Sequence, residues 1–206
     1  MRHDEAIERI QEIHRIAERT TLYTLLPGVP AIAGGLLVLA GCVVSYAMIR
    51  SLDFQEVLSL SMGAQIGFCA MWTAIGVIAV AYHIVWTAAA ARRQGLSPAA
   101  RPGRFSALAL SPSVLVALVL TAKFLADEQV QYIAPVWMMC YGTGVYAAGL
   151  FSVRLPRLLG LAMLMAGMFA LLCTEYGLPL TVLSFGVLHI LFGLAVVRTT
   201  RRETQQ

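Results

Sequence analysis

The amino-acid sequence predicts an all-α membrane protein, with six transmembrane helices and a short helix before them. The 206 residues are 59% apolar and only 13% charged, and their mean hydropathy is +0.75. A soluble domain carries roughly 25% charged residues because its surface contacts water. The apolar residues also gather in six runs. Most of these runs are close to the roughly 20 residues that a helix needs to cross the hydrocarbon core.

Residues 1–26 precede the first apolar run and are predicted to form a cytosolic amphipathic helix. Asp4 follows a polar start, and small or apolar residues recur every three or four positions from Ala6 to Thr24. Acids and arginines are mixed along this segment, so it lacks the cationic face of a helix that lies on a membrane. We interpret it as a helix packed beneath the bundle, or as a docking helix for a partner or a second copy.

The transmembrane bundle is predicted over residues 27–198, and residues 199–206 form a cytosolic tail. Each apolar run is assigned to one spanning helix. The second run is long enough to tilt or to project from the membrane, and the fifth is the shortest of the six. The predicted spans are 30–49, 64–90, 105–125, 132–152, 157–174 and 179–197.

Prolines in these runs have two predicted roles. Pro112 and Pro135 fall inside predicted helices and are expected to kink them. The hydroxyls of Ser111 and Ser113 flank Pro112 and could bond the carbonyl that this proline leaves free. Other prolines lie at helix entries, where a first-turn proline loses no hydrogen bond. These are Pro27, Pro30, Pro156 and Pro179.

The distribution of arginine predicts that both termini are cytoplasmic. Arginines are concentrated before the first span, in the second and fourth connections, and after the last span. The connections on the opposite side contain five acids, with only Arg50 and Lys123 beside them. Positive residues favour the cytoplasmic side, so this distribution sets the orientation of the bundle in the membrane. Because the arginines form short clusters and no continuous basic face, the net charge of +4 does not indicate nucleic-acid binding.

Glycines spaced seven residues apart mark faces where helices are expected to approach closely. Seven residues are about two helical turns, so such a pair forms a flat strip for a neighbouring backbone. The second run has the same period in Cys69, Gly76 and His83. These strips predict either packing within the chain or an interface with another chain. The glycine pairs are Gly34/Gly41, Gly142/Gly149, Gly160/Gly167 and Gly186/Gly193.

His83 and His189 are the candidate ligand-binding residues. Each lies beside a small-residue strip, and each precedes the first cytosolic arginine of its helix by nine residues, or about 13 Å of depth. We expect both imidazoles to point inward and their two helices to be neighbours. Three interpretations remain open: histidines bonded to local carbonyls or hydroxyls, a proton, metal or ligand site, and bis-histidine ligation of haem b. No cofactor is otherwise expected.

The sequence offers little support for catalysis. None of the six runs contains an acid, although cation- and proton-coupled transporters commonly use one. Metalloprotease and nucleotide-binding motifs do not occur, and the four cysteines form no Cys-x-x-Cys pair. The connections are too short to hold a catalytic domain. No metal site or catalytic residue is therefore predicted.

Three short features resemble small multi-pass bacterial inner-membrane proteins of uncharacterised families. These are the charged Ile-Glu-Arg-Ile-Gln-Glu-Ile lead at residues 7–13, the Pro-Gly start of the first span, and Phe185-Gly186 with His189 and Gly193 in the last span. The resemblance implies a bacterial inner membrane as the location and implies no activity.

The leading functional hypothesis is a non-enzymatic accessory or regulatory subunit. Such a protein would contact lipid and another membrane protein, or a second copy of itself, through the N-terminal helix and the glycine strips. The alternatives are a small transporter or ligand-binding bundle that uses His83 and His189, and an electron-transfer subunit with haem b.

Overall fold

The computed structural model describes residues 28–93, 101–150 and 154–203, except for the side chains of residues 101–106 and 203. The helix predicted over residues 1–26 lies outside the described residues. Within them, all regular structure is helical. The elements are α2 (Gly28–Ile49), η1 (Phe54–Ser59), α3 (Met62–Arg93), α4 (Arg101–Ala126), η2 (Val130–Tyr132), α5 (Ile133–Leu150), α6 (Arg154–Leu172), η3 (Thr174–Tyr176), α7 (Gly177–Thr181), the π-helix η4 (Val182–Val187) and α8 (Leu188–Glu203).

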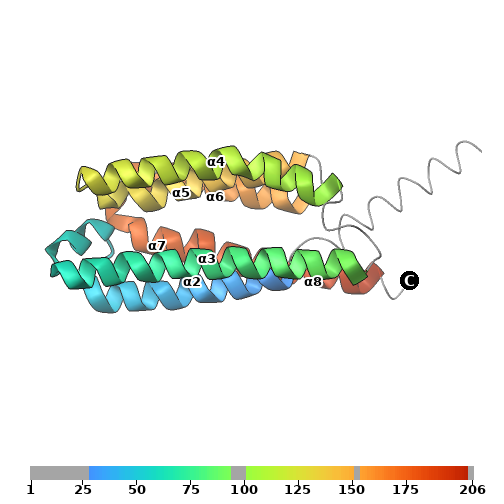
Figure 1. Cartoon of the computed structure of the whole chain (residues 1–206), viewed down its shortest axis with the longest axis horizontal. Helices are drawn as coiled ribbons and strands as arrows, with labels where there is room; N and C mark the ends of the chain where they lie inside the picture. Colours follow the sequence, from blue (N-terminus) through green and yellow to red (C-terminus); the bar gives the residue numbers. More distant parts are fainter. Residues whose placement is uncertain (1–27, 94–100, 151–153, 204–206) are drawn as a thin grey trace, which may run out of the picture.

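The long helices lie along a common axis and form two layers (Figure 1). One layer contains α4, α5 and α6, and α5 packs against both of the others. The second layer contains α2, α3 and α8, and α2 packs against both of the others. Contacts of α6 with α7, η4 and α8 connect the layers. The segment from α7 to α8 is therefore one of the places where the two layers pack together.

Among the residues that the structure describes, five helical segments are long and apolar enough to cross a membrane. Many of their large apolar side chains are exposed, including Ile66, Val77 and Ile84 on α3. Such a continuous apolar surface is unfavourable in water and suits contact with lipid. The chain is thus an α-helical membrane protein. The five segments are Gly28–Ile49, Met62–Arg93, Ala107–Ala126, Arg154–Leu172 and Thr174–Arg202.

The helix that corresponds to the predicted fourth span, α5, is not among these five. Its sequence includes three glycines, two tyrosines, a tryptophan and a threonine, which lower its hydropathy. Because α5 packs between α4 and α6, much of its surface contacts protein instead of lipid. Its buried residues include Val136, Met138 and Val145. A helix with protein neighbours on two sides needs less apolar surface than one that faces lipid all round.

Short helices close one end of the bundle, where η1 contacts η2 and η2 contacts η3. The side chain of Gln55 joins the connections of the two layers. Its Nε2 donates to the carbonyl oxygen of Glu128 at 3.0 Å, and its Oε1 accepts from the backbone N–H of Gln131 at 3.4 Å. Beneath it, the ring of Phe54 lies 6.1 Å from that of Phe68 and 6.2 Å from that of Trp72. This end therefore combines an apolar core with polar contacts between the layers.

The two prolines predicted to kink helices differ in position. Pro112 lies inside α4, and the hydroxyl of Ser111 donates to the carbonyl of Leu108 at 3.2 Å. That carbonyl is the one that residue 112 would have bonded in a regular helix, so the predicted compensation is confirmed for Ser111. The prediction for Pro135 is wrong. Because α5 begins at Ile133, Pro135 lies in the first turn, where no donor is needed.

Candidate functional site

The segment formed by η4 and α8 presents one face to each layer and carries the candidate site. Gly186 and Gly193 face α2. A Cβ atom at Gly193 would overlap the carbonyl oxygen of Gly28, and one at Gly35 would lie 2.7 Å from the carbonyl oxygen of Gly186. The other face packs on the cluster of Val145, Leu159 and Met163 in α5 and α6. The residues on that face are Phe185, Leu188 and Phe192.

The π-helix gives His189 a hydrogen-bond partner in its own backbone. Residues Val182–Val187 adopt the wider π-helical turn, and the Nδ1 atom of His189 lies 3.0 Å from the carbonyl oxygen of Ser184. A carbonyl oxygen can only accept, so Nδ1 carries the hydrogen and donates it. Nε2 is then the unprotonated nitrogen of a neutral imidazole. π-Helical turns are frequent at functional positions in helices.

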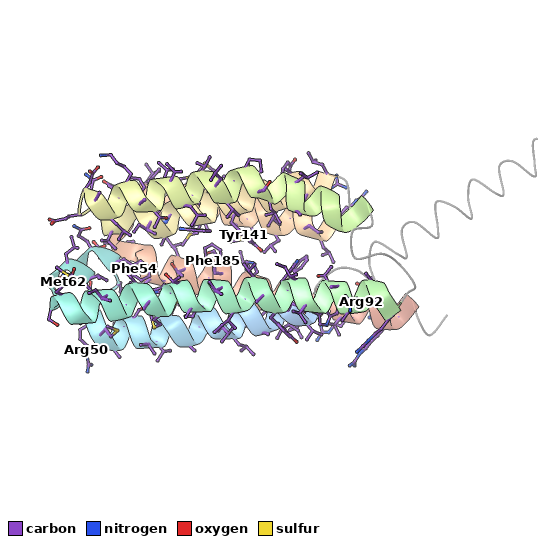
Figure 2. All side chains as sticks on the ribbon, viewed as in Figure 1. Arg50, Phe54, Met62, Arg92, Tyr141 and Phe185 are labelled. Atoms are coloured by element: carbon purple, nitrogen blue, oxygen red, sulfur yellow. The ribbon has the colours of Figure 1, made fainter. Side chains whose placement is uncertain are left out.

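The unprotonated nitrogen of His189 faces the other layer. Its Nε2 lies 3.4 Å from the hydroxyl of Tyr141 on α5, and the hydroxyl is the donor in this long hydrogen bond. The ring of Phe185 stacks on that of His189 with centroids 5.8 Å apart and planes 19° apart. Tyr141 lies 5.7 Å from Phe185 and 5.6 Å from His189, and Figure 2 shows Tyr141 and Phe185 between the layers. The three rings form a polar, hydrogen-bonded contact inside an apolar interface.

Replacing His189 with leucine is expected to lower the free energy of unfolding by about 1–3 kcal/mol, because the Ser184 carbonyl would lose its imidazole donor. Tyr141→Phe removes only the longer bond and should cost less than about 1 kcal/mol. Unfolding of the purified protein in mixtures of dodecyl maltoside and SDS would measure both. A larger loss for Tyr141→Phe than for His189→Leu would contradict the assignment of the 3.0 Å bond as the stronger one.

The glycines of α5 and α6 face each other across a close helix–helix contact. A Cβ atom at Gly142 would lie 2.8 Å from the carbonyl oxygen of Gly160, and one at Gly160 would lie 2.6 Å from that of Gly142. A Cβ atom at Gly149 would lie 2.8 Å from the backbone nitrogen of Arg157, and one at Gly167 would lie 2.9 Å from that of Met139. All four predicted positions thus lie where another backbone comes close.

Two strips of glycines lie side by side on α2. The strip that was predicted, Gly34 and Gly41, is offset by one residue from the strip that contacts α8. Gly41 faces Ile75 and Trp72 of α3, and the nearest atom to a Cβ at Gly34 is the Cβ of Ala79, 3.9 Å away. The predicted pair therefore faces α3. The pair that approaches α8 is Gly28 and Gly35, which also has heptad spacing. One residue turns a helix by about 100°, so adjacent heptad strips serve different neighbours.

The strip of Cys69, Gly76 and His83 does not point inward, and this prediction is wrong. Cys69 and His83 are exposed, and no described atom lies within 4 Å of a Cβ placed at Gly76. The face of α3 that packs on α2 is formed by the residues that directly precede those of the predicted strip. It contains Phe68 and Ile75 together with Trp72, whose Nε1 donates to the buried Ser45 hydroxyl at 3.1 Å.

The predicted packing between the helices of His83 and His189 is also wrong. α8 packs mainly against α2 and α6, whereas α3 packs against α2 and η1. Both helices use α2 as their neighbour, through different faces of it. No hydrogen bond or ring contact joins His83 to His189 or to another described residue. Across the described ranges, no group of three His, Cys, Asp or Glu side chains is placed to hold a metal ion.

Tyr141 and Gly35 are the contacts that the sequence alone does not single out. Tyr141 directly precedes Gly142, one of the predicted glycines. This position next to a close helix contact is the signal that could have pointed to Tyr141. Gly35 is adjacent to Gly34 and forms its own heptad pair with Gly28. Comparison of this chain with protein-family models, curated proteins and solved structures gives no match.

Proposed function

We propose that this protein is a non-enzymatic subunit of a membrane complex and binds a transmembrane helix of another chain through α3. The observation that carries the proposal is the strip of Cys69, Gly76 and His83. The sequence predicts that this strip packs against a helix, but no described helix of this chain covers it. We call these three residues the α3 strip. In the proposed topology the chain crosses a bacterial inner membrane six times, with α5 as the additional span and both termini in the cytoplasm.

His83 supports a partner helix at this strip. It lies nine residues before Arg92, which corresponds to a depth of about 13 Å from the end of the helix. A polar side chain at that depth is unfavourable against lipid, and such residues ordinarily face protein or water. Within the described ranges His83 has no hydrogen-bond partner. A helix laid along the α3 strip would shield the imidazole from lipid and could supply a donor or an acceptor.

The openness of α3 supports the same proposal. Among its 32 residues only Phe68 and Ala91 are buried, whereas the 22 residues of α2 include seven that are buried. Small residues at a helix surface favour association in the membrane because they let two backbones approach closely. In α5 and α6 the glycines already have such neighbours. Gly76 lies on the same face of α3 as His83, and no described atom lies within 4 Å of a Cβ atom placed there, so a neighbouring helix has room to approach.

The test is the size of the complex in mild detergent. We expect the wild-type chain to migrate in blue-native electrophoresis as an assembly larger than its 22.3 kDa monomer. Gly76→Leu would obstruct a partner backbone and should reduce the assembled fraction about tenfold, within the range expected for overpacking. Ala74→Leu makes a similar change about 160° away on an exposed part of α3 and should leave assembly intact. A wild-type monomer, or equal effects of both substitutions, would contradict the proposal.

A further inference from the structure

The described helices form two groups of three that pack in the same way. In chain order the first group is α2, α3 and α4, and the second is α5, α6 and the segment from α7 to α8. The first helix of each group packs against the second, as α2 does against α3 and α5 against α6. The third helix packs mainly against the first helix of the other group, since α4 packs on α5 and α8 packs on α2. Each layer therefore holds two helices of one group and the third helix of the other.

The two groups run in opposite directions. The colours of Figure 1 show that α2 and α5 follow the long axis of the bundle in opposite senses, as do α3 and α6, and α4 and α8. A two-fold axis across the bundle therefore relates the first group to the second. Units related in this way are the inverted repeats from which many membrane transporters are built, with the axis in the plane of the membrane.

Close contacts at glycines repeat between the groups. In each first helix, two glycines seven residues apart face the second helix of the same group. A further glycine faces the third helix of the other group. A Cβ atom at Gly35 would lie 2.7 Å from the carbonyl oxygen of Gly186, and one at Gly144 would lie 2.9 Å from the side chain of Leu110 in α4. The spaced pairs are Gly34/Gly41, which face α3, and Gly142/Gly149, which face α6.

The third helices of the two groups are interrupted at matching positions. α4 contains Pro112, and the segment from α7 to α8 contains the π-helix Val182–Val187. The pattern Ser-x-x-Val-Leu-x-x-Leu begins at Ser111 in α4 and again at Ser184 in η4. In inverted repeats, interrupted helices at corresponding positions of the two halves mark the region around which the halves rock. The internal symmetry thus places this region between the two layers.

The contacts between the layers do not follow the internal symmetry. α6 packs against η4 and α8 in the cluster that includes Leu159 and Phe192. The equivalent contact of the first group would join α3 and α4, and among the described residues these helices do not pack along each other. Apolar side chains of both helices, such as Ile84 and Leu108, are exposed. The structure therefore forms only one of two equivalent contacts.

We propose that the two layers rock between this arrangement and a second one, in which α3 and α4 approach each other and α6 and α8 separate. At one end the layers are joined, because Gln55 bonds the carbonyl of Glu128, and Phe54 and Val130 belong to one cluster. The motion is therefore largest at the opposite end, where Figure 2 labels Arg92. It involves helices of this chain alone, so it does not depend on a partner helix at the α3 strip.

Double electron–electron resonance of the full-length protein in lipid nanodiscs tests the motion. The four native cysteines are replaced by alanine, and spin labels are attached in pairs at exposed positions near the end that moves. One pair reports on α3 and α4, and the other, in a separate sample, reports on α6 and α8. We expect two distances for each pair, with equal populations of the shorter α3–α4 distance and the longer α6–α8 distance. The labelled pairs are Ile84→Cys with Leu108→Cys, and Leu158→Cys with Leu194→Cys.

Substitutions at Phe192 should shift these populations. Phe192→Ala weakens the contact between α6 and α8 and should raise the ratio of the second arrangement to the first about tenfold, only part of the effect of removing a fully buried phenylalanine ring. Phe192→Leu should shift both pairs in the same direction by less. Leu191→Ala is the matched control, because its exposed side chain lies about 100° away on α8, and it should leave the populations unchanged.

Three results would overturn the proposal. One is a single distance for each pair in the parent protein and in all three variants. Another is a shift in the α6–α8 pair without a shift in the α3–α4 pair, because it would show local loosening of α8 alone. The third is an equal shift in Phe192→Ala and Leu191→Ala, because the contact of α8 with α6 would then not control the motion.

Discussion

Gly160→Ala is expected to disrupt the contact between α5 and α6 and to lower the free energy of unfolding by about 3 kcal/mol, the upper end of the usual range for overpacking. A Cβ atom at this position would lie 2.5 Å from the backbone nitrogen of Tyr146 and 2.6 Å from the carbonyl oxygen of Gly142. Both obstacles are backbone atoms of a helix, so neither can rotate away. The helices would have to separate along most of their shared length.

The measurement is the fraction of folded protein as SDS is added to the detergent-solubilised chain. Gly76→Ala is the control, because no described atom lies within 4 Å of the added methyl group. Alanine is favoured over glycine in a helix by about 1 kcal/mol, so the control should be neutral or slightly more stable. If Gly160→Ala unfolded at the same SDS fraction as the control, the close packing of α5 on α6 would be contradicted.

Gly35→Ala should destabilise the contact between α2 and α8, and its neighbour Gly34 provides the comparison. A Cβ atom at Gly35 would lie 2.7 Å from the carbonyl oxygen of Gly186 and 3.3 Å from the backbone nitrogen of Ile190. We expect a loss of about 2–3 kcal/mol. At Gly34 the nearest atom is the Cβ of Ala79 at 3.9 Å, an ordinary contact, so Gly34→Ala should be tolerated.

Thermal stability of the two variants in dodecyl maltoside, followed by size-exclusion chromatography after heating, checks this pair. The two substitutions are adjacent and chemically identical, so differences in helix propensity and hydropathy cancel. A lower melting temperature for Gly35→Ala alone would support the packing of α8 on α2. If Gly34→Ala were the more damaging change, α2 would be rotated about its axis relative to its position in the structure.

The positions of the long helices are the part of the fold that is predictable from the sequence. An apolar run of about 20 residues has few alternatives to a helix, and the predicted run at 30–49 lies within α2. The compensation at Pro112 was also predictable, because the freed carbonyl and the hydroxyl of Ser111 are close in sequence. These features depend on local spacing alone.

Which helices meet could not be predicted, because a heptad of small residues has the same period whatever its partner is. Phe68 and Cys69 begin adjacent heptad strips on α3, yet the first is buried and the second is exposed. Gly34 and Gly35 differ in the same way on α2. The contact of Tyr141 with His189 spans 48 positions of the chain. Such contacts depend on helix rotation and on the order of helices in the layers, which periodicity does not encode.

The central claim, that the α3 strip meets a helix of another chain, is tested most directly by cross-linking from Cys69. A variant that keeps Cys69 and lacks Cys42, Cys140 and Cys173 would be labelled in membranes with benzophenone maleimide and irradiated. A second variant would carry its only cysteine at the exposed Ile78, about 180° around α3. We predict a discrete protein adduct from Cys69 and only lipid adducts from Ile78→Cys. Lipid adducts alone from both positions would contradict the claim.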